Sequence, residues 1–390
     1  MSNKKIASIF DAELFGYFNT AKVITFGGQP MYLFDIIKAC LISKSNLLLL
    51  GGTGLGKTTL AKSIGDSFFN GEMNQLRMNK EANLKEVYEN FNPKADELIA
   101  INRSITSNLI TFIDEFNRAP ELIQNDLFNI MDGYYNFKGR REQLGRDGYH
   151  IIIAAANPYN DDYSGTFNTD EALLNRFPVV INMDYFEPTP KDTTQILLKR
   201  SNDEKNDLSE SIINEWKKVK GTIKDVNYLK DTTLELITTQ YLIHGLDYCE
   251  KHKVSKKGIT IRDCEGCNNM GGFCAVTNKA NPRIKRVYQD LFPAFIKVFE
   301  HITGEEYKLD GTNTFYDFFE VLKLVAPYNG IIKDEVINSR FKGNPYDASN
   351  LILNAIRTEV YENKNLINEA LRSDKKLLDG RLSFVNQLRW

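Results

Sequence analysis

The sequence predicts an α/β fold with a parallel sheet in its first half, followed by a mostly helical part. Two observations carry this prediction. Short, uniformly apolar runs alternate with stretches of helical periodicity up to about residue 187, and Glu187-Pro188-Thr189-Pro190 then ends the alternation. The chain has 390 residues, which is long enough for two or three domains.

The strands of the predicted sheet are short apolar runs. Such runs are typical of strands that are buried on both faces, as in a parallel sheet covered by helices. The predicted strands are Leu47–Leu50, Leu109–Ile113, Ile151–Ala156, Val179–Met183 and, more weakly, one near Gln75–Met78.

The part of the chain after residue 187 has a helical pattern. The predicted helices are Asp192–Arg200, Ser209–Val219, Thr232–Tyr248, Pro282–His301, Thr314–Val325 and Ala348–Leu371. We therefore predict an α/β core over residues 1–187, a helical lid over 188–335 and a helical C-terminal extension over 336–390. The stretch 249–281, rich in Cys, Gly and Lys, reads as an insert in the lid, with a strand-like part at Gly258–Arg262.

Composition and charge exclude several classes of protein. Hydrophobic residues make up 42% and charged residues 26% of the chain, which excludes wholesale disorder. The formal charge of −2 gives no bulk argument for nucleic acid or a membrane surface. No apolar run is long enough to span a bilayer, and the N-terminus lacks the apolar core of a signal peptide. We expect a cytoplasmic protein.

A phosphate-binding loop follows the first predicted strand. Gly51-Gly52-Thr53-Gly54-Leu55-Gly56-Lys57-Thr58 matches the P-loop pattern between a strand and a helix. Glycines let backbone N–H groups face the phosphates, and the helix N-terminus favours anions. Lys57 is expected to contact the β- and γ-phosphates, and Thr58 to ligate Mg²⁺. The predicted nucleotide-binding residues are Gly52, Thr53, Gly54, Leu55, Gly56, Lys57, Thr58 and Thr59.

Polar residues end two further predicted strands. Asp114 and Glu115 follow an apolar strand, and neighbouring strand residues point to opposite sides. We expect Asp114 to hold the Mg²⁺ shell and Glu115 to polarise the attacking water. Asn157 follows the next strand, where it either orients water and contacts the γ-phosphate or is an ordinary turn residue before Pro158.

Taken together, these residues resemble the AAA+ ATPases, and Asp114-Glu115-Phe116-Asn117-Arg118-Ala119-Pro120 is similar to the signature of the MoxR group in the helix-2-insert clade. Further similar elements occur in the same order over about residues 20–335, with a break at roughly 230–280. They are Gly28-Gln29, Gln124–Met131, the arginine-finger-like Ala172–Phe177 with Asn175 for the usual Asp, the sensor-2-like Asn281-Pro282-Arg283, and the lid segment Phe318–Ile331.

The resemblance implies an AAA+ P-loop αβα core with a parallel sheet and a helical lid. It also implies a hexameric ring with ATP and Mg²⁺ bound between subunits. Arg176 would act in trans on the neighbour's γ-phosphate, the alternative being a surface salt bridge at a strand start. Arg283 would sense nucleotide in cis, the alternative being an ordinary arginine on the solvated face of a helix N-terminus. Arg118 either contacts a neighbouring subunit or pairs with Glu121. Residues 79–104 take the place of the clade's insert, and the stretch between Asp132 and His150 takes the place of a hairpin that faces the pore or is plain surface.

A cysteine cluster lies outside the family pattern. Cys264 and Cys267 have the spacing of a zinc knuckle, and Cys249 and Cys274 can complete a tetrahedral site, as can His252. We prefer the set of four cysteines and the alternative is four unligated thiols. The segment is also basic, which suits a solvated surface, nucleic acid or an acidic protein.

Three functions remain after this reading. The first is a ring-forming ATPase that remodels or matures a partner protein, for which the family suggests a von Willebrand A-domain protein. The second is a nucleic-acid motor of the McrB-like branch, and the third is a nucleotide-gated scaffold with negligible turnover, which the acid at Glu115 disfavours. No motif distinguishes ATP from GTP.

Overall fold

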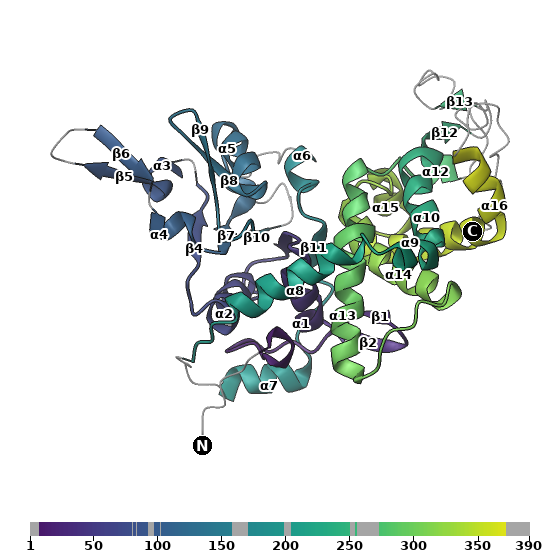
Figure 1. The fold of residues 1–390 in the computed structure, drawn as a ribbon, viewed down its shortest axis with the longest axis horizontal. Coiled ribbons are helices and arrows are strands. Elements are labelled where there is room, and N and C mark those ends of the chain that lie inside the picture. The colour runs from purple at the N-terminus through teal and green to yellow at the C-terminus, as the bar shows by residue number, and fades with distance from the viewer. Residues whose placement is uncertain are drawn as a thin grey trace. The chain divides into compact units, whose positions relative to one another are not determined.

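The computed structural model describes residues 8–79, 81–82, 84–92, 97–101, 103–157, 171–198, 204–249, 254–255 and 273–371. The chain divides into two compact units (Figure 1). The first unit comprises Met1–Val23, Pro30–Gly221 and Ala294–Gly304, and the second comprises Ile24–Gln29, Thr222–Pro293 and Glu305–Trp390.

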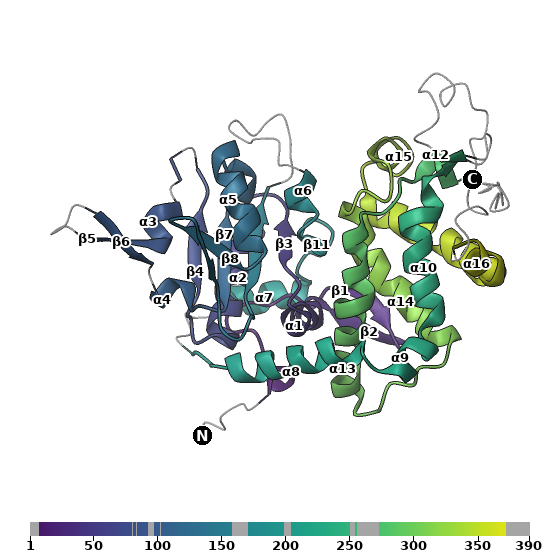
Figure 2. The ribbon, with the colours of Figure 1, turned by 45° about the horizontal axis from the view of Figure 1, so that its top comes forward.

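A five-stranded sheet forms the centre of the first unit (Figure 2). Its strand order is β11-β3-β10-β7-β4, and every pairing is parallel. The strands are β3 (Leu47–Leu50), β4 (Asn74–Arg77), β7 (Ile110–Asp114), β10 (Ile151–Ala156) and β11 (Val179–Asn182). All five predicted strands are present, with ends shifted by one residue at most.

Helices and hairpins surround this sheet. The longer helices are α1 (Leu33–Ser43), α2 (Lys57–Phe68), α5 (Glu121–Met131), α7 (Pro190–Leu198) and α8 (Ser209–Thr222). Shorter ones are α3 (Leu84–Tyr88), α4 (Arg103–Thr106) and α6 (Glu171–Leu174). Two antiparallel pairs complete the unit: β5 (Glu89–Asn92) with β6 (Glu97–Ile101), and β8 (Tyr134–Phe137) with β9 (Arg140–Gln143). A further pair, β1 (Lys22–Phe26) with β2 (Gln29–Tyr32), is divided between the units, since Ile24–Gln29 belong to the second.

The inner strands and β11 of this sheet are apolar on both faces, whereas the edge strand β4 alternates buried and exposed residues. Every residue of β10 and of β11 is buried, as is most of β3. Burial on both faces requires helical layers on both sides, which the alternating sequence supplies. After β3 the chain continues to β4, at one edge of the sheet, whereas the neighbour of β3 on its other side is β11, at the opposite edge. The carboxyl end of β3 is therefore a point where the strand order reverses. Ligands of open α/β sheets bind at such points.

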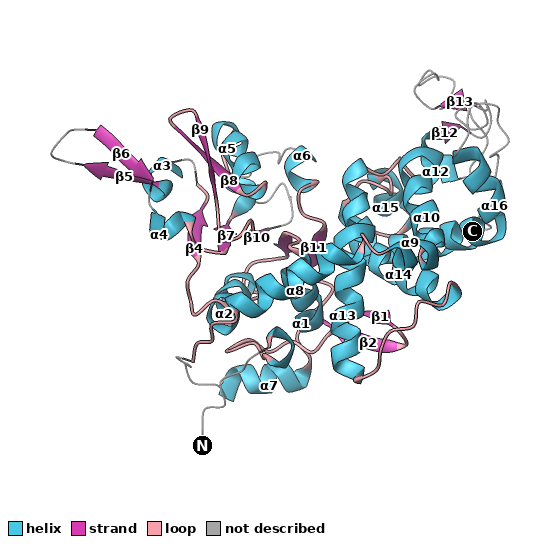
Figure 3. Ribbon diagram, in the orientation of Figure 1, coloured by secondary structure: helices cyan, strands magenta, loops and turns pink. Residues whose placement is uncertain are grey.

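The second unit is almost entirely helical (Figure 3). Its helices are α9 (Val226–Asp231), α10 (Thr233–His244), α12 (Phe273–Val276), α14 (Thr312–Val325), α15 (Asp334–Arg340) and α16 (Pro345–Leu371), joined by the first residues of α13 (Phe292–Thr303). A short pair, β12 (Tyr248–Cys249) with β13 (Val254–Ser255), follows α10. Its core is aromatic, with Phe292 and Phe318 in edge-to-face contact.

Two predicted helices differ from the structure. The helix predicted over Thr232–Tyr248 ends at His244 and gives way to a 3₁₀ turn and β12. The helix predicted over Pro282–His301 consists of a 3₁₀ turn, a π-helical segment at Val287–Leu291, and then α13. Pro293 explains the second difference, because proline has no N–H to donate to the preceding turn, and π-turns relieve such breaks.

The division between the units falls after Gly221 rather than near residue 187. The reason is that α8 and the chain before it pack on the α/β unit. The Ile9 N–H donates to Ser211 Oγ at 3.0 Å, the Asn70 N–H donates to the Asn206 carbonyl at 2.7 Å, and Trp216 meets Tyr149 edge-on.

Among the described residues, no helix is long and apolar enough to cross a membrane.

Candidate functional site: a phosphate loop at the end of strand β3

The loop between β3 and α2 has the backbone geometry of a phosphate cradle. Strand β3 ends at Leu50 and α2 begins at Lys57, so the glycine-rich loop connects them directly. Gly56 caps the N-terminus of α2 with a φ of 78°, and Gly54 has a φ of 89°. Residues with a side chain rarely adopt these angles, which explains why glycine occupies both positions. The loop therefore directs backbone N–H groups towards an anion at the helix N-terminus.

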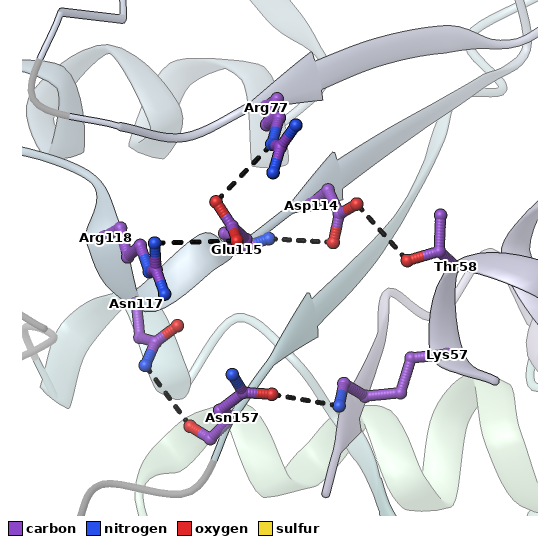
Figure 4. Close-up of polar contacts among 8 residues, drawn as sticks. All are labelled: Lys57, Thr58, Arg77, Asp114, Glu115, Asn117, Arg118 and Asn157. Carbon is purple, nitrogen blue, oxygen red and sulfur yellow. Dashed lines mark hydrogen bonds and ion pairs between the residues drawn. The ribbon is translucent and has the colours of Figure 1, made fainter. Parts of the chain in front are cut away.

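Lys57 joins the loop to the end of β10 (Figure 4). Its ammonium donates to the carbonyls of Gly51 and Gly52 at 2.6 and 2.7 Å, and to Asn157 Oδ1 at 3.0 Å. Burial lowers the pKa of Lys57, while the carboxylates of Asp184 and Asp114 act in the opposite direction. Among the described residues, the acceptors of this half-buried cation are neutral oxygens, which the oxygens of a phosphate can replace.

The pair of Thr58 and Asp114 suits a hard divalent cation. Thr58 Oγ1 donates to Asp114 Oδ2 at 3.2 Å, and the Glu115 N–H donates to Asp114 Oδ1 at 3.0 Å. The two side chains come from different elements, α2 and β7, and converge beside the phosphate loop (Figure 4). Hydroxyl and carboxylate oxygens are the ligands that Mg²⁺ prefers, so the donor set fits this ion.

Glu115 turns away from its neighbour Asp114 and lies between two arginines. Its backbone is left-handed, with a φ of 54°. Its carboxylate oxygens lie 3.5 Å from Arg77 Nε and 3.6 Å from Arg118 Nη1. Arg118 therefore pairs with Glu115, an arrangement that neither of our two sequence-based alternatives included.

Two polar contacts near the loop were not predicted from the sequence. Asn117 Nδ2 donates to the Asn157 carbonyl at 3.2 Å, which ties the segment after β7 to the end of β10. Asp184, which follows β11, accepts the N–H of Gly52 at 3.1 Å. Asp184 lies close to the loop because β11 pairs with β3, a neighbour relation that no local motif encodes.

Arg176 lies between α6 and β11, where its guanidinium pairs with Asp132. Arg283 is in the second unit, in a 3₁₀ turn capped by Asn281. The roles given to both arginines from the sequence stay predictions. Among the described residues there is no group of three or more His, Cys, Asp or Glu side chains that could hold a metal. Cys264 and Cys267 lie outside the described residues, so the zinc prediction stays open.

A comparison with family models decides the class of this site. Residues 46–177, which run from before the phosphate loop to just after Arg176, match the AAA domain of the dynein-related subfamily. This part of the chain is an AAA domain. The match includes the residues around Lys57, Asp114, Glu115 and Asn157, so the AAA+ assignment made from the motifs is confirmed.

Relatives of this chain include proteins from several bacteria. An uncharacterized protein of Staphylococcus haemolyticus is 30% identical over 171 residues, covering 40% of this chain and 61% of the relative. The Holliday junction branch migration complex subunit RuvB of Acholeplasma laidlawii is 26% identical over 194 residues, covering 48% and 51%. The uncharacterized protein YojN of Bacillus subtilis is 29% identical over 171 residues, covering 40% and 52%. The chain thus spans about half to three fifths of these relatives.

A solved structure extends the likeness in fold to both units of the chain. The crystal structure of a candidate ATPase from Cytophaga hutchinsonii superposes with a TM-score of 0.57 at 13% identity. It covers 85% of this chain and 90% of that protein. The helical part after the AAA domain therefore belongs to the shared fold. The narrower MoxR-like assignment stays a prediction.

Proposed function

We propose that this AAA+ ATPase forms a ring and couples Mg²⁺-dependent ATP hydrolysis to the remodelling or maturation of a partner protein. One observation supports the hydrolytic part above all. Lys57, Thr58, Asp114 and Asn157 come from three separate elements and meet at the carboxyl edge of the sheet. Charge-neutralising, metal-binding and polar groups at one point are what phosphoryl transfer requires.

Each residue at this edge has a separate role. The loop amides and Lys57 bind and orient the phosphates, and Asn157 holds the Lys57 ammonium and contacts the γ-phosphate. Thr58 and Asp114 would hold Mg²⁺, which neutralises phosphate charge when it is bound. Glu115 orients and polarises the attacking water. This role requires its carboxylate to leave at least one of its two arginine partners, Arg77 or Arg118.

The ring and the partner form the second part of the proposal. Arg176 acts on the neighbouring subunit's nucleotide, Arg283 senses nucleotide within its own subunit, and six subunits close the ring. A von Willebrand A-domain protein is the adaptor or substrate that the family resemblance suggests. The proposed setting is the cytoplasm, and four cysteines, Cys249, Cys264, Cys267 and Cys274, are proposed to hold a structural zinc.

Two variants test the hydrolytic site. Lys57→Ala should weaken ATP binding, because the phosphates lose their mobile cation. Glu115→Gln should bind ATP normally and lose turnover by about 10²- to 10⁴-fold, the usual contribution of a positioned base. Nucleotide titration and steady-state hydrolysis are measured in parallel. Normal turnover in Glu115→Gln would remove Glu115 as the base. The same variant, loaded with ATP, serves as bait for the partner in a native extract.

The β8–β9 hairpin favours a second candidate function, a nucleic-acid motor. Arg141 stacks on Tyr134 with 3.4 Å between guanidinium carbon and ring centroid, and Lys138 lies over Phe137. Arg140 is exposed beside them. Exposed cations with aromatic rings suit phosphates and stacked bases. Single-stranded DNA or RNA should then stimulate ATP hydrolysis, and Arg140→Ala should remove the stimulation. Stimulation by a partner protein alone would favour the first function.

A further inference from the structure

The side chain of Arg176 is held by Phe128, in helix α5, and by Asp132, the residue that caps the C-terminus of that helix. Its Nε and Nη2 donate to the two carboxylate oxygens of Asp132, each at 3.1 Å. Its guanidinium carbon also lies 4.5 Å from the ring centroid of Phe128. Phe128 and Asp132 are four residues apart, which places them on one side of the C-terminal end of α5. A two-point hydrogen bond together with a ring contact sets both the position and the plane of the guanidinium.

The backbone under this pair is fixed by a single buried side chain. Asn46, just before β3, donates from Nδ2 to the carbonyls of Met131 and Arg176 at 3.3 and 3.2 Å. Its Oδ1 accepts the N–H of Ile152 in β10 at 3.0 Å. The Asn46 amide is thus hydrogen-bonded to Arg176 and to Met131, the residue before Asp132. The same amide is hydrogen-bonded to β10 in the central sheet.

The pair is also better protected from water than an ordinary surface ion pair. The Arg176 side chain is 13% exposed and that of Asp132 is 34% exposed. The exposed ion pair of Lys217 and Asp147, by comparison, has side chains that are 52% and 60% exposed. Partial burial makes an Arg–carboxylate pair more rigid, because solvent competes less for the same donors.

We propose that Asp132 is the positioning residue for Arg176, holding its guanidinium in the orientation in which it meets the nucleotide of the neighbouring subunit. This inference rests on the proposed trans role of Arg176. An arginine has many rotamers, and ordering it only when the transition state forms would reduce the rate. With Asp132 and Phe128 in place, that ordering is complete before the subunits meet.

A mixed ring separates positioning from simple structural support. The parental mixture joins Lys57→Ala subunits, which supply Arg176 but do not hydrolyse, with Arg176→Ala subunits, which hydrolyse only with a neighbour's arginine. Asp132→Asn is then added to one partner at a time. On the Lys57→Ala donor it should lower kcat by about 10²-fold, the scale of a misplaced catalytic group, with little change in the KM for ATP. On the Arg176→Ala acceptor, where no arginine remains to be positioned, kcat should stay unchanged.

Two further variants complete the test. Asp132→Glu on the donor keeps the carboxylate and should restore part of the lost kcat. Asp147→Asn on the donor removes an exposed ion-pairing carboxylate elsewhere in the same unit and should leave kcat as in the parental mixture. Thermal melting and native mass spectrometry show that each variant folds and that mixed rings form.

The outcomes are distinct. An equal loss of kcat on donor and acceptor would overturn the positioning role and leave a structural one, and a rise in kcat on the donor would show that Asp132 restrains Arg176. A parental mixture that forms mixed rings without activity would refute the trans role of Arg176, and the inference about Asp132 would fall with it. Loss of kcat confined to the donor, with partial rescue by Asp132→Glu, would establish the proposal.

Discussion

Arg77 Nε lies 3.5 Å from a carboxylate oxygen of Glu115, the residue expected to polarise the attacking water. The contact exists because β4 pairs in parallel with β7, with Arg77 opposite Asp114 in the register. The ion pair with Arg77 connects Glu115 to strand β4. The ion pair with Arg118 connects Glu115 to the turn that follows it. The residue proposed as the base is thus held by two cations on either side of it.

Arg77→Gln should raise basal ATP hydrolysis, because the Glu115 carboxylate then has one competing cation fewer. The Arg77 side chain is 75% exposed, and an exposed ion pair is worth at most about 1 kcal/mol, so we expect a rise of about two- to fivefold. Steady-state hydrolysis at saturating ATP measures the change. Arg146→Gln, which removes an exposed pair with Glu210, is the matched control. A drop to the level of Glu115→Gln would instead make Arg77 essential for placing the base.

Asn157→Ala should lower kcat, because the ammonium of Lys57 loses the hydrogen bond that it donates to Asn157 Oδ1 at 3.0 Å. A hydrogen bond to a charged group is worth about 1.5–3 kcal/mol, which corresponds to about 10- to 100-fold in rate if the bond matters in the transition state. Asn157→Asp keeps the size but adds a negative charge near the phosphates, so it should also weaken ATP binding.

The comparison of the two variants decides the role of Asn157. Hydrolysis and nucleotide titration distinguish loss of rate from loss of affinity. Unchanged kcat in Asn157→Ala would leave Asn157 as the ordinary turn residue that the sequence also allows.

The sequence predicts those parts of the fold and site that a local pattern encodes. The runs Leu47–Leu50 and Ile151–Ala156 are apolar throughout, and both are strands within those bounds. Lys57, Thr58 and Asp114 belong to contiguous motifs, so their meeting at one edge follows once the sheet is parallel.

Residues whose role depends on which elements become neighbours have no such pattern. Arg77 reaches Glu115 only because β4 pairs with β7, and Asp184 reaches the phosphate loop only because β11 pairs with β3. In the sequence, Asp132 is an ordinary acidic residue at the end of a helix, and only the structure shows that it pairs with Arg176. The division after Gly221 is of the same kind, since it depends on α8 packing against the first unit.

Protein purified without chelator should contain about one zinc per chain if the cysteine cluster forms a structural site. The reason is chemical: four thiolates at this spacing bind zinc tightly, and a short segment with few apolar residues gains most of its folding energy from the metal. Elemental analysis counts the metal. Cys264→Ser should lose it, whereas Cys40→Ala, which changes a buried cysteine in α1, should retain it. Metal-free wild-type protein would eliminate the zinc site.

Glu235→Gln should stabilise the second unit at alkaline pH. Glu235 is buried in α10, and neither of its carboxylate oxygens has a hydrogen-bond partner among the described residues. Burial raises the pKa of Glu235 from 4.5 to about 8, so the folded state favours the protonated carboxyl group. Its contribution to stability is complete below pH 4.5, decreases as the pH rises towards about 8 because the unfolded chain ionises first, and is constant above that. Glutamine keeps the shape without this loss.

The difference in Tm between Glu235→Gln and the wild type should therefore widen between pH 5 and pH 8 and then level off, at about 2–4 °C for each kcal/mol gained. Thermal melting across this pH range measures it. Glu335→Gln, which makes the same change at an exposed residue of α15 in the same unit, is the matched control. The pH dependence is the decisive readout, because a simple gain in packing at position 235 would raise Tm equally at every pH. A constant offset from pH 5 to pH 8 would show that Glu235 is ionised, or solvated, in the folded protein.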